Sequence, residues 1–195
     1  IAKMNLYLHG LEDFQIRRGD TFRDPKFTKG TQLTKFDVVI ANPPFSLQNW
    51  GAADWAKDTY GRAFCGVPPA KNGDYAWIQH MVSSMNETTG RVGVVMPHGV
   101  LFRGGREGEI RQCLVEKDLL EAVIGLPNNL FYSTSIPVCL LIWRKTKPAK
   151  RAGKVLFIDA SARFEAGKNQ NTMDDDDIET IYAAYSRGED IDGED

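Results

Sequence analysis

The segment FDVVIANPPF, residues 36–45, constrains the fold of this chain more than any other part of it. Its first six residues are an apolar run with the length and composition of a buried β-strand. Pro43 and Pro44 must end that strand, because proline has no N–H to donate and its φ is fixed at about −65°. The chain therefore leaves the predicted sheet as a stiff, extended segment at the C-terminal end of a strand, where open α/β sheets bind their ligands.

This turn presents groups that suit chemistry on a planar exocyclic amine, such as N6 of adenine. The Asn42 side-chain oxygen can accept one N–H of the amine, and the Pro43 carbonyl can accept the other. Two fixed acceptors would draw the nitrogen towards tetrahedral geometry and aim its lone pair at an electrophile. The Phe45 ring offers a face on which a base can stack. The alternative is a loop in which Pro-Pro only stops a strand.

Apolar runs alternate with stretches of helical periodicity along the rest of the chain. Strands are predicted over residues 14–18, 36–41, 91–96, 119–127, 136–143 and 155–159, and helices over 2–9, 74–85, 107–117 and 174–185. This alternation, with near-continuous apolar strands, indicates a mostly parallel α/β sheet. We expect residues 1–160 to form the main domain and 161–195 an acidic helical tail, whose DDDD run suits a helix N-terminus.

Two stretches carry no clear periodicity. Residues 23–35 are polar and predicted to be a loop. Residues 46–72 are rich in Gly, Ala, Trp and Pro, and we interpret them as a long, mobile loop beside the proline turn. Loops of this length in a compact domain are usually functional or disordered. Trp50, Trp55 and Tyr60 are therefore candidate contacts to a substrate.

The cysteines and histidines give no metal signature. Cys65, Cys113 and Cys139 are far apart and none belongs to a CxxC pair, which argues against a zinc cluster or a disulfide framework and fits a reducing cytoplasm. The histidines are equally scattered, and His98, in the sequence PHG, is interpreted as part of a structural turn. No apolar run approaches the length of a membrane span, and none is expected.

Charge is distributed unevenly along the chain. Residues 1–155 carry 21 Lys and Arg against 14 Asp and Glu, a balance of +7, whereas residues 156–195 carry 3 against 12, a balance of −9. The body of the chain is mildly basic, which is compatible with a polyanionic partner, and its end is acidic. The basic excess alone is weak support for nucleic-acid binding.

Several motifs taken in order are more specific than any one of them. The series GDTF, NPPF, GDYAWIQHM, VMPHGVLFRGG and LPNNLFYSTSIP resembles the modification subunits of type I restriction–modification systems, which are DNA adenine-N6 methyltransferases. The resemblance covers residues 5–160. It implies a Rossmann-like sheet, S-adenosylmethionine as the cofactor, double-stranded DNA as the substrate, and a specificity subunit and a restriction subunit as partners.

The same resemblance implies roles for individual residues. The tetrapeptide from Asn42 to Phe45 matches the catalytic motif, and Asp20 and Thr21, together with Asn42, match positions that bind the cofactor. Phe131 matches an aromatic residue that stacks, like Phe45, on the target base once it has left the duplex. Tyr132 is a neighbouring candidate for that stacking role. Two alternatives remain open, an ordinary Gly-Asp turn for Asp20 and a hydrophobic loop for Phe131.

One departure from the family affects the expected activity. No glycine-rich cofactor loop of the xxCGxGxF kind precedes residue 1, so the N-terminal cofactor-loop strands are expected to be absent. We interpret the chain as a piece of a longer protein and expect it to be inactive alone. Two alternatives to a DNA methyltransferase remain, namely a methyltransferase acting on protein glutamine or RNA, and a non-catalytic assembly module.

Overall fold

The computed structural model describes residues 1–132 and 135–188. Residues 133–134 of the motif LPNNLFYSTSIP and residues 189–195 of the predicted acidic tail lie outside this description. The helices are α1 (Ala2–Leu8), α2 (Ala52–Trp55), α3 (Asp74–Ser83), α4 (Gly99–Phe102), α5 (Arg106–Glu116), the 3-10 helix η1 (Ala149–Arg151) and α6 (Asp175–Arg187). The strands are β1 (Thr28–Lys29), β2 (Gln32–Leu33), β3 (Val38–Ala41), β4 (Arg91–Pro97), β5 (Leu120–Gly125), β6 (Val138–Arg144) and β7 (Leu156–Asp159).

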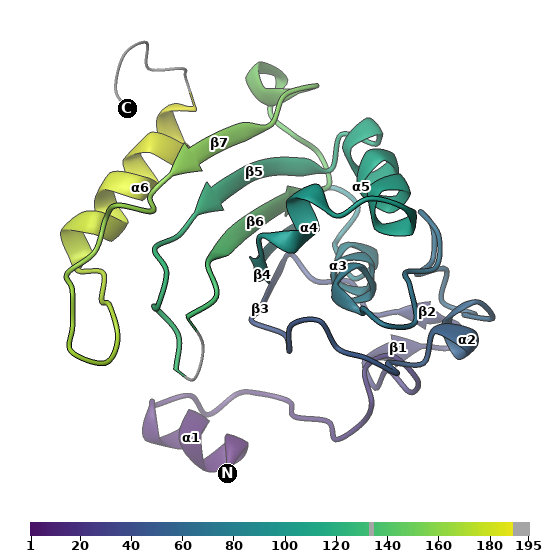
Figure 1. The fold of residues 1–195 in the computed structure, drawn as a ribbon. Helices are drawn as coiled ribbons and strands as arrows, with labels where there is room; N and C mark the ends of the chain where they lie inside the picture. The colour runs from purple at the N-terminus through teal and green to yellow at the C-terminus, as the bar shows by residue number, and fades with distance from the viewer. Residues whose placement is uncertain (133–134, 189–195) are drawn as a thin grey trace.

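Five of these strands form one mixed sheet in the order β3-β4-β6-β5-β7 (Figure 1). β3 is parallel to β4 and β5 is parallel to β7, but β6 lies between β4 and β5 and is antiparallel to both. The predicted α/β fold is confirmed, whereas the prediction of a mostly parallel sheet is wrong. β6 is antiparallel to β5 because the chain re-enters the sheet at the end where β5 finishes, and the described part of this connection contains no crossover helix.

The predicted strand over residues 14–18 is also wrong, since these residues are irregular in the structure. Their polar and charged side chains alternate with apolar ones, but no described strand lies beside them to pair with. Five short elements were missed. The hairpin strands β1 and β2 lie within the predicted loop 23–35, and α2 lies within the predicted loop 46–72. The other two are α4, which follows β4, and η1, which precedes β7.

The hydrophobic core lies between α3, α5 and one face of the sheet. The apolar positions of α3 recur at helical spacing and face β4, so that Ile78 and Met85, just beyond the helix, are fully buried. Ile110 and Leu114 of α5 and Val94 of β4 complete this layer and are equally buried. The helical periodicity seen in the sequence is therefore the periodicity of core packing.

β3 forms one edge of the sheet, and its exposure differs from the prediction of a buried strand. Val38 and Ile40 are 65% and 79% exposed, although Val39 packs against the core. Val38 and Ile40 are exposed because β3 is an edge strand, with β4 as the only strand that pairs with it among the described residues. An apolar run thus lies open at the edge that carries the proline turn.

α6 lies along β7, at the opposite edge of the sheet (Figure 1). It begins with a capping box in which the Asp174 carboxylate accepts the Asp177 N–H, as the DDDD run predicted. At its other end, the Tyr185 hydroxyl donates to Glu121 of β5 at 2.9 Å. No helix among the described residues has the length and apolar character needed to cross a membrane.

The cysteine spacing, which argued against a disulfide framework, did not reveal a disulfide that the structure contains. Cys65 and Cys113 are 48 residues apart in sequence but form a disulfide, with their Cα atoms 5.7 Å apart. The bond joins the segment before α3 to α5, a proximity that no local spacing of cysteines could reveal. Cys139 is a free thiol on β6, and burial raises its pKa to about 12.

Candidate active site

The proline turn follows β3 at the C-terminal end of the strand, beside the end of β4. Asn42 and Pro44 are exposed, Pro43 is buried and Phe45 is half-buried. Among the hydrogen bonds between described residues, none involves the Asn42 side chain. The amide of Asn42 is therefore available to a ligand, as the prediction requires.

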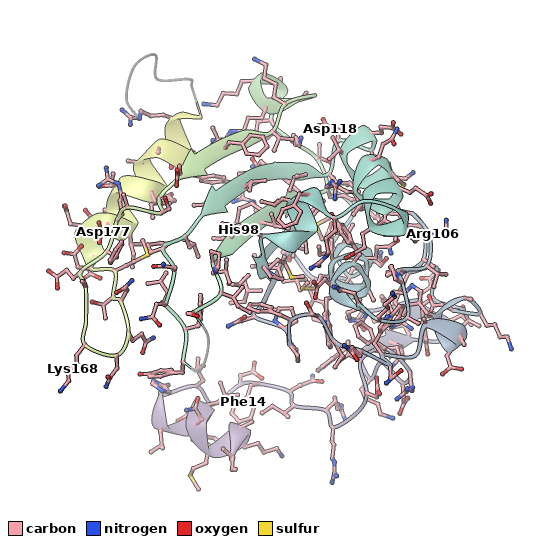
Figure 2. The ribbon with its side chains drawn as sticks, viewed as in Figure 1. Phe14, His98, Arg106, Asp118, Lys168 and Asp177 are labelled. Atoms are coloured by element: carbon pink, nitrogen blue, oxygen red, sulfur yellow. A yellow bond between two sulfur atoms is a disulfide. The ribbon has the colours of Figure 1, made fainter. Side chains whose placement is uncertain are left out.

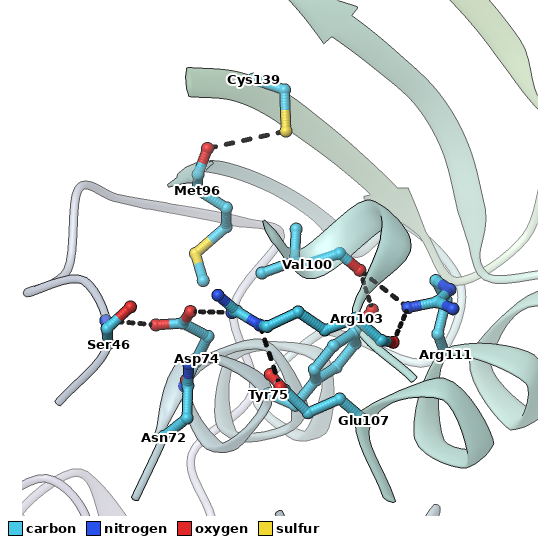
Figure 3. Close-up of polar contacts among 10 residues, drawn as sticks. All are labelled: Ser46, Asn72, Asp74, Tyr75, Met96, Val100, Arg103, Glu107, Arg111 and Cys139. Carbon is cyan, nitrogen blue, oxygen red and sulfur yellow. Dashed lines mark hydrogen bonds and ion pairs between the residues drawn. The ribbon is translucent and has the colours of Figure 1, made fainter. Parts of the chain in front are cut away.

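The residue after the tetrapeptide is held in an uncommon conformation. Ser46 has a backbone φ of 51°, in the left-handed region, which residues other than glycine rarely adopt. Its backbone N–H donates to Asp74 Oδ1 at 2.7 Å (Figure 3). Asp74 is the first residue of α3 and is fully buried, so the proline turn is tied directly to the core.

Asp74 belongs to a buried ionic cluster that the sequence did not reveal. Its second oxygen pairs with Arg103, and Arg103 Nε donates to Glu107 Oε2 at 2.9 Å (Figure 3). Burial alone would lower the pKa of Arg103, but its bonds to Asp74 and Glu107 raise it. Burial raises the pKa of Glu107, whose Oε1 has no hydrogen-bond partner in the described part of the chain.

Two further side chains fix the segment that carries Arg103. The Tyr75 hydroxyl donates to the Val100 carbonyl at 2.6 Å, and Arg111 Nη1 donates to the carbonyls of Val100 and Arg103 at 3.1 and 2.9 Å. Burial raises the pKa of Tyr75 to about 12, so its hydroxyl remains a donor at neutral pH. α4 and the ionic cluster are thus anchored together (Figure 3).

Asp20 and Thr21, two of the three predicted cofactor residues, lie on a turn separate from the one that carries Asn42. The Asp20 carboxylate accepts the backbone N–H groups of Phe22 and Arg23 at 2.9 and 3.1 Å, and Arg23 Nη1 lies 3.4 Å from its other oxygen. Thr21 contributes its carbonyl to Arg62 Nη1 at 2.9 Å. The structure therefore shows an ordinary aspartate turn, with the Asp20 side chain still exposed to a ligand.

Arg62 connects this turn to the segment after the tetrapeptide, and sequence reasoning missed it. It is 2% exposed, pairs with Asp58 at 2.6 Å and donates to the Phe22 carbonyl at 2.7 Å. Its guanidinium also lies 4.2 Å from the centre of the Trp55 ring. An arginine among aromatic residues within a polar loop was the only signal that could have indicated this role.

Residues 46–72 form a mostly irregular segment as predicted, apart from α2, but the prediction that Trp50 and Trp55 contact a substrate is wrong. Trp50 and Trp55 are 3% and 2% exposed and pack around Phe22, so they are core residues rather than substrate contacts. His80 faces Arg62 from α3. Burial, and then the charge of Arg62, lower the pKa of His80 to about 4, so the ring is neutral at pH 7.

Phe131 and Tyr132 lie in the connection between β5 and β6, at the end of the sheet where β3 and β5 both finish and the proline turn begins. Phe131 is half-buried and Tyr132 is 88% exposed. Within the sheet, β4 lies between β3 and β6, and both β4 and β6 lie between β3 and β5. Asn171 anchors the connection by donating to the carbonyl of Asn128 at 3.0 Å and by its N–H to that of Asn129 at 2.9 Å.

His98 lies at the start of α4, near the start of β6 (Figure 2). Its Nε2 is 3.1 Å from the Val138 carbonyl. This contact joins β6 to the segment after β4, which agrees with the interpretation of PHG as a structural turn.

Known proteins resemble the chain over nearly its whole length. A family model described as N-6 DNA methylase matches residues 1–194. The methylase subunit of the type I restriction enzyme MjaVII from Methanocaldococcus jannaschii is 39% identical over 207 residues, which cover 99% of this chain and 34% of that protein. The HindI methylase subunit from Haemophilus influenzae is 35% identical over 162 residues, which cover 82% of this chain and 34% of that protein.

A solved structure gives the same result. The crystal structure of a type I restriction–modification methyltransferase subunit from Streptococcus thermophilus superposes with a TM-score of 0.89 and 40% identity, over 98% of this chain and 40% of that chain. The chain spans about a third of the length of the two curated relatives. The match to the family model covers all but the last residue, and the chain belongs to the N-6 DNA methylase family.

Proposed function

We propose that this chain is the catalytic part of a DNA adenine-N6 methyltransferase, within the modification subunit of a type I restriction–modification system. One observation carries the proposal. The Asn42 amide, which bonds to no described residue, lies exposed at the C-terminal end of β3 on a turn whose backbone is restricted by two prolines. In a member of the N-6 DNA methylase family, this is the group suited to hold the amine of adenine.

The chemistry follows from two acceptors. Asn42 Oδ1 accepts one N–H of the adenine amine and the Pro43 carbonyl accepts the other, which leaves the nitrogen lone pair directed at the methyl donor. No strong base is required, because the nitrogen becomes acidic once it is alkylated. Phe45 and, from the connection between β5 and β6, Phe131 stack on the base after it leaves the duplex.

S-adenosylmethionine supplies an electrophilic methyl group when it is bound. Asp20, Thr21 and Asn42 are the residues of this chain that would hold it. The Asp20 carboxylate fits the amino group of the adenosine part, because its Oδ2 has only the 3.4 Å contact with Arg23 and retains acceptor capacity. These residues provide for the adenosine end of the cofactor.

The proposed partners are double-stranded DNA and the specificity and restriction subunits of the same system, in the cytoplasm. The relatives from Methanocaldococcus jannaschii and Haemophilus influenzae are methylase subunits of type I restriction enzymes, which supports this assignment. The balance of +7 over residues 1–155, from 21 basic against 14 acidic residues, suits a polyanionic substrate. We retain the division into a catalytic part, residues 1–160, and a tail, residues 161–195, as part of the proposal.

The test uses the protein at its full natural length, assembled with its partner subunits. We expect Asn42→Ala and Phe45→Ala each to lower adenine methylation by about a hundredfold or more, because each removes a contact made to the reacting base. Asn42→Ala should leave the urea midpoint of unfolding unchanged, and Phe45→Ala, which truncates a half-buried ring, should lower it only slightly. Gln48→Ala is the matched control, since Gln48 is an exposed amide in the same connection.

Near-normal methylation by Asn42→Ala or Phe45→Ala would contradict the proposed mechanism. Parallel reactions with RNA and with a glutamine-containing protein substrate separate the alternatives. Methyl transfer to RNA or to glutamine, with none to DNA, would show that the proposed substrate is wrong. If the assembled wild-type protein methylates none of the three, the non-catalytic assembly role would be the remaining alternative.

A further inference from the structure

The backbone of the proline turn is restricted at Pro43 and Pro44 and less restricted at Phe45 and Ser46. Pro43 and Pro44 have φ values fixed by their rings, whereas φ and ψ are both free to vary at Phe45 and Ser46. Ser46 adopts φ of 51°, which costs a serine more than it costs a glycine. A hydrogen bond from outside the turn offsets part of this cost.

Asp74 supplies that contact. Its Oδ1 accepts the Ser46 N–H at 2.7 Å, and a carboxylate makes a stronger hydrogen bond than a neutral acceptor. Asp74 is rigidly placed, because it begins α3 and its own N–H donates to Asn72 Oδ1 at 2.9 Å. It is 0% exposed, so it contacts no substrate itself.

Arg103 completes the arrangement by pairing with the other oxygen of Asp74. Without it, Asp74 would be a buried charge with no counterion. The backbone leaves room for this arginine at Gly99, where an added Cβ would lie 2.7 Å from Arg103 Cζ. Gly99→Ala therefore displaces the guanidinium without removing any charge.

We infer that Asp74 and Arg103 are positioning residues that hold the Ser46 turn and thereby aim Asn42 and Phe45 at the substrate. Asp74 acts through the Ser46 N–H, and Arg103 acts through Asp74 (Figure 3). This inference rests on the proposed function, since it assigns a task to residues that support the proposed catalytic tetrapeptide.

The first test measures the turn itself, by hydrogen–deuterium exchange of the Ser46 amide in the protein at its full natural length. Asp74→Asn keeps the shape of the side chain but removes its charge, and we expect the Ser46 amide to exchange at least tenfold faster. Gly99→Ala should act in the same direction. Arg106→Gln is the matched control, because Arg106 lies nearby but pairs with Glu109 on the surface (Figure 2).

The second test measures methyl transfer and separates positioning from general stability. Asp74→Asn should lower kcat at least tenfold, while the Kd values for DNA and for S-adenosylmethionine change less than twofold. Adding Ser46→Gly should restore kcat to within about threefold of the wild type, because glycine adopts this conformation without a holding bond. A loss caused by a weakened core would not be rescued by glycine at position 46.

Unchanged Ser46 exchange in both Asp74→Asn and Gly99→Ala would overturn the inference, and so would failure of Ser46→Gly to restore kcat. Failure of the proposed function is distinguishable from either result. If the assembled wild type transfers no methyl group, the proposed function is wrong, and the exchange experiment still decides whether Asp74 and Arg103 hold the turn.

Discussion

Glu107 and Glu121 are both buried carboxylates, yet they are paired to different extents. Glu121 Oε1 accepts from Arg144 and Arg151 at 3.1 and 3.0 Å, and its Oε2 accepts from the Tyr185 hydroxyl. Glu107 has Arg103 on one oxygen, while its other oxygen has no partner among residues 1–132 and 135–188.

The pKa values of the two carboxyls move in opposite directions. Burial raises the pKa of Glu107, and Arg103 only partly offsets the rise. Burial would also raise the pKa of Glu121, but the bonds from Tyr185, Arg144 and Arg151 outweigh it and lower the value. The cluster around Glu121 fastens α6 to the sheet, whereas the cluster around Glu107 places a turn. The ionic cluster around Glu107, which positions a turn, need not stabilise the fold as much as the cluster around Glu121.

Loss of charge at Glu121 should give the largest difference between the two clusters. Glu121→Gln leaves Arg144 and Arg151 without a carboxylate partner, and we expect the free energy of unfolding to fall by about 3–5 kcal/mol. Urea denaturation followed by circular dichroism measures the change. The control is Glu109→Gln, which breaks an exposed pair with Arg106 and should cost less than about 0.5 kcal/mol. Equal losses of unfolding free energy in Glu121→Gln and Glu109→Gln would show that the buried pairs of Glu121 stabilise the fold no more than an exposed pair does.

Acid should loosen the region around the proposed site before it loosens α6. The pKa of His80 is lowered from its ordinary value of 6.5 to about 4, so the stability contributed by its neutral ring is present above pH 6.5 and is lost as pH falls towards 4. The shift corresponds to about 3 kcal/mol. The contribution of Glu121, whose pKa is lowered from 4.5, is lost only below that pH.

Urea denaturation between pH 7 and pH 4 tests this order. His80→Gln should flatten the fall in stability over that range, and His9→Gln, in an exposed position after α1, should leave it unchanged. Hydrogen exchange should rise first in residues 46–72 and later in α6. The prediction is contradicted if hydrogen exchange rises in α6 before it rises in residues 46–72.

The smallest effect is expected at Glu107. Its pKa is raised, so its contribution to stability is largest below the ordinary value of 4.5 and is lost as pH rises through the raised value. Glu107→Gln mimics the protonated form, and its stability relative to the wild type should therefore improve from pH 4 to pH 7. The change should stay within about 1 kcal/mol, the difference between a charged and a neutral hydrogen bond to Arg103. A relative loss on raising the pH would contradict the raised pKa.

Local patterns predicted most of the helices and strands. The apolar spacing of α3 and the DDDD run before α6 each describe contacts that a helix makes within itself or with one neighbouring layer. The strand before the prolines was also located, although its exposure was not. Exposure depends on which strand lies beside β3, and that partner is remote in sequence.

In the candidate site, too, some features could be predicted from the sequence and others could not. The exposure of Asn42 at the end of a strand could be predicted, because the two prolines act within four residues, whereas the half-burial of Phe45 could not. The burial of Trp50 and Trp55 could not, since it depends on Phe22 and Arg62 meeting around them. The roles of Asp20 and Phe131 remain predictions.

The sequence by itself determined the proline turn, the helical faces and the family, because these depend on fixed φ values, on the periodicity of apolar residues and on motifs in a linear order. Only the tertiary structure decided that Cys65 meets Cys113, that β6 runs antiparallel between β4 and β5, and that Asp74 holds Ser46. Each of these joins residues far apart along the chain. Such pairings result from packing of the whole sheet and its helices, which no local pattern encodes.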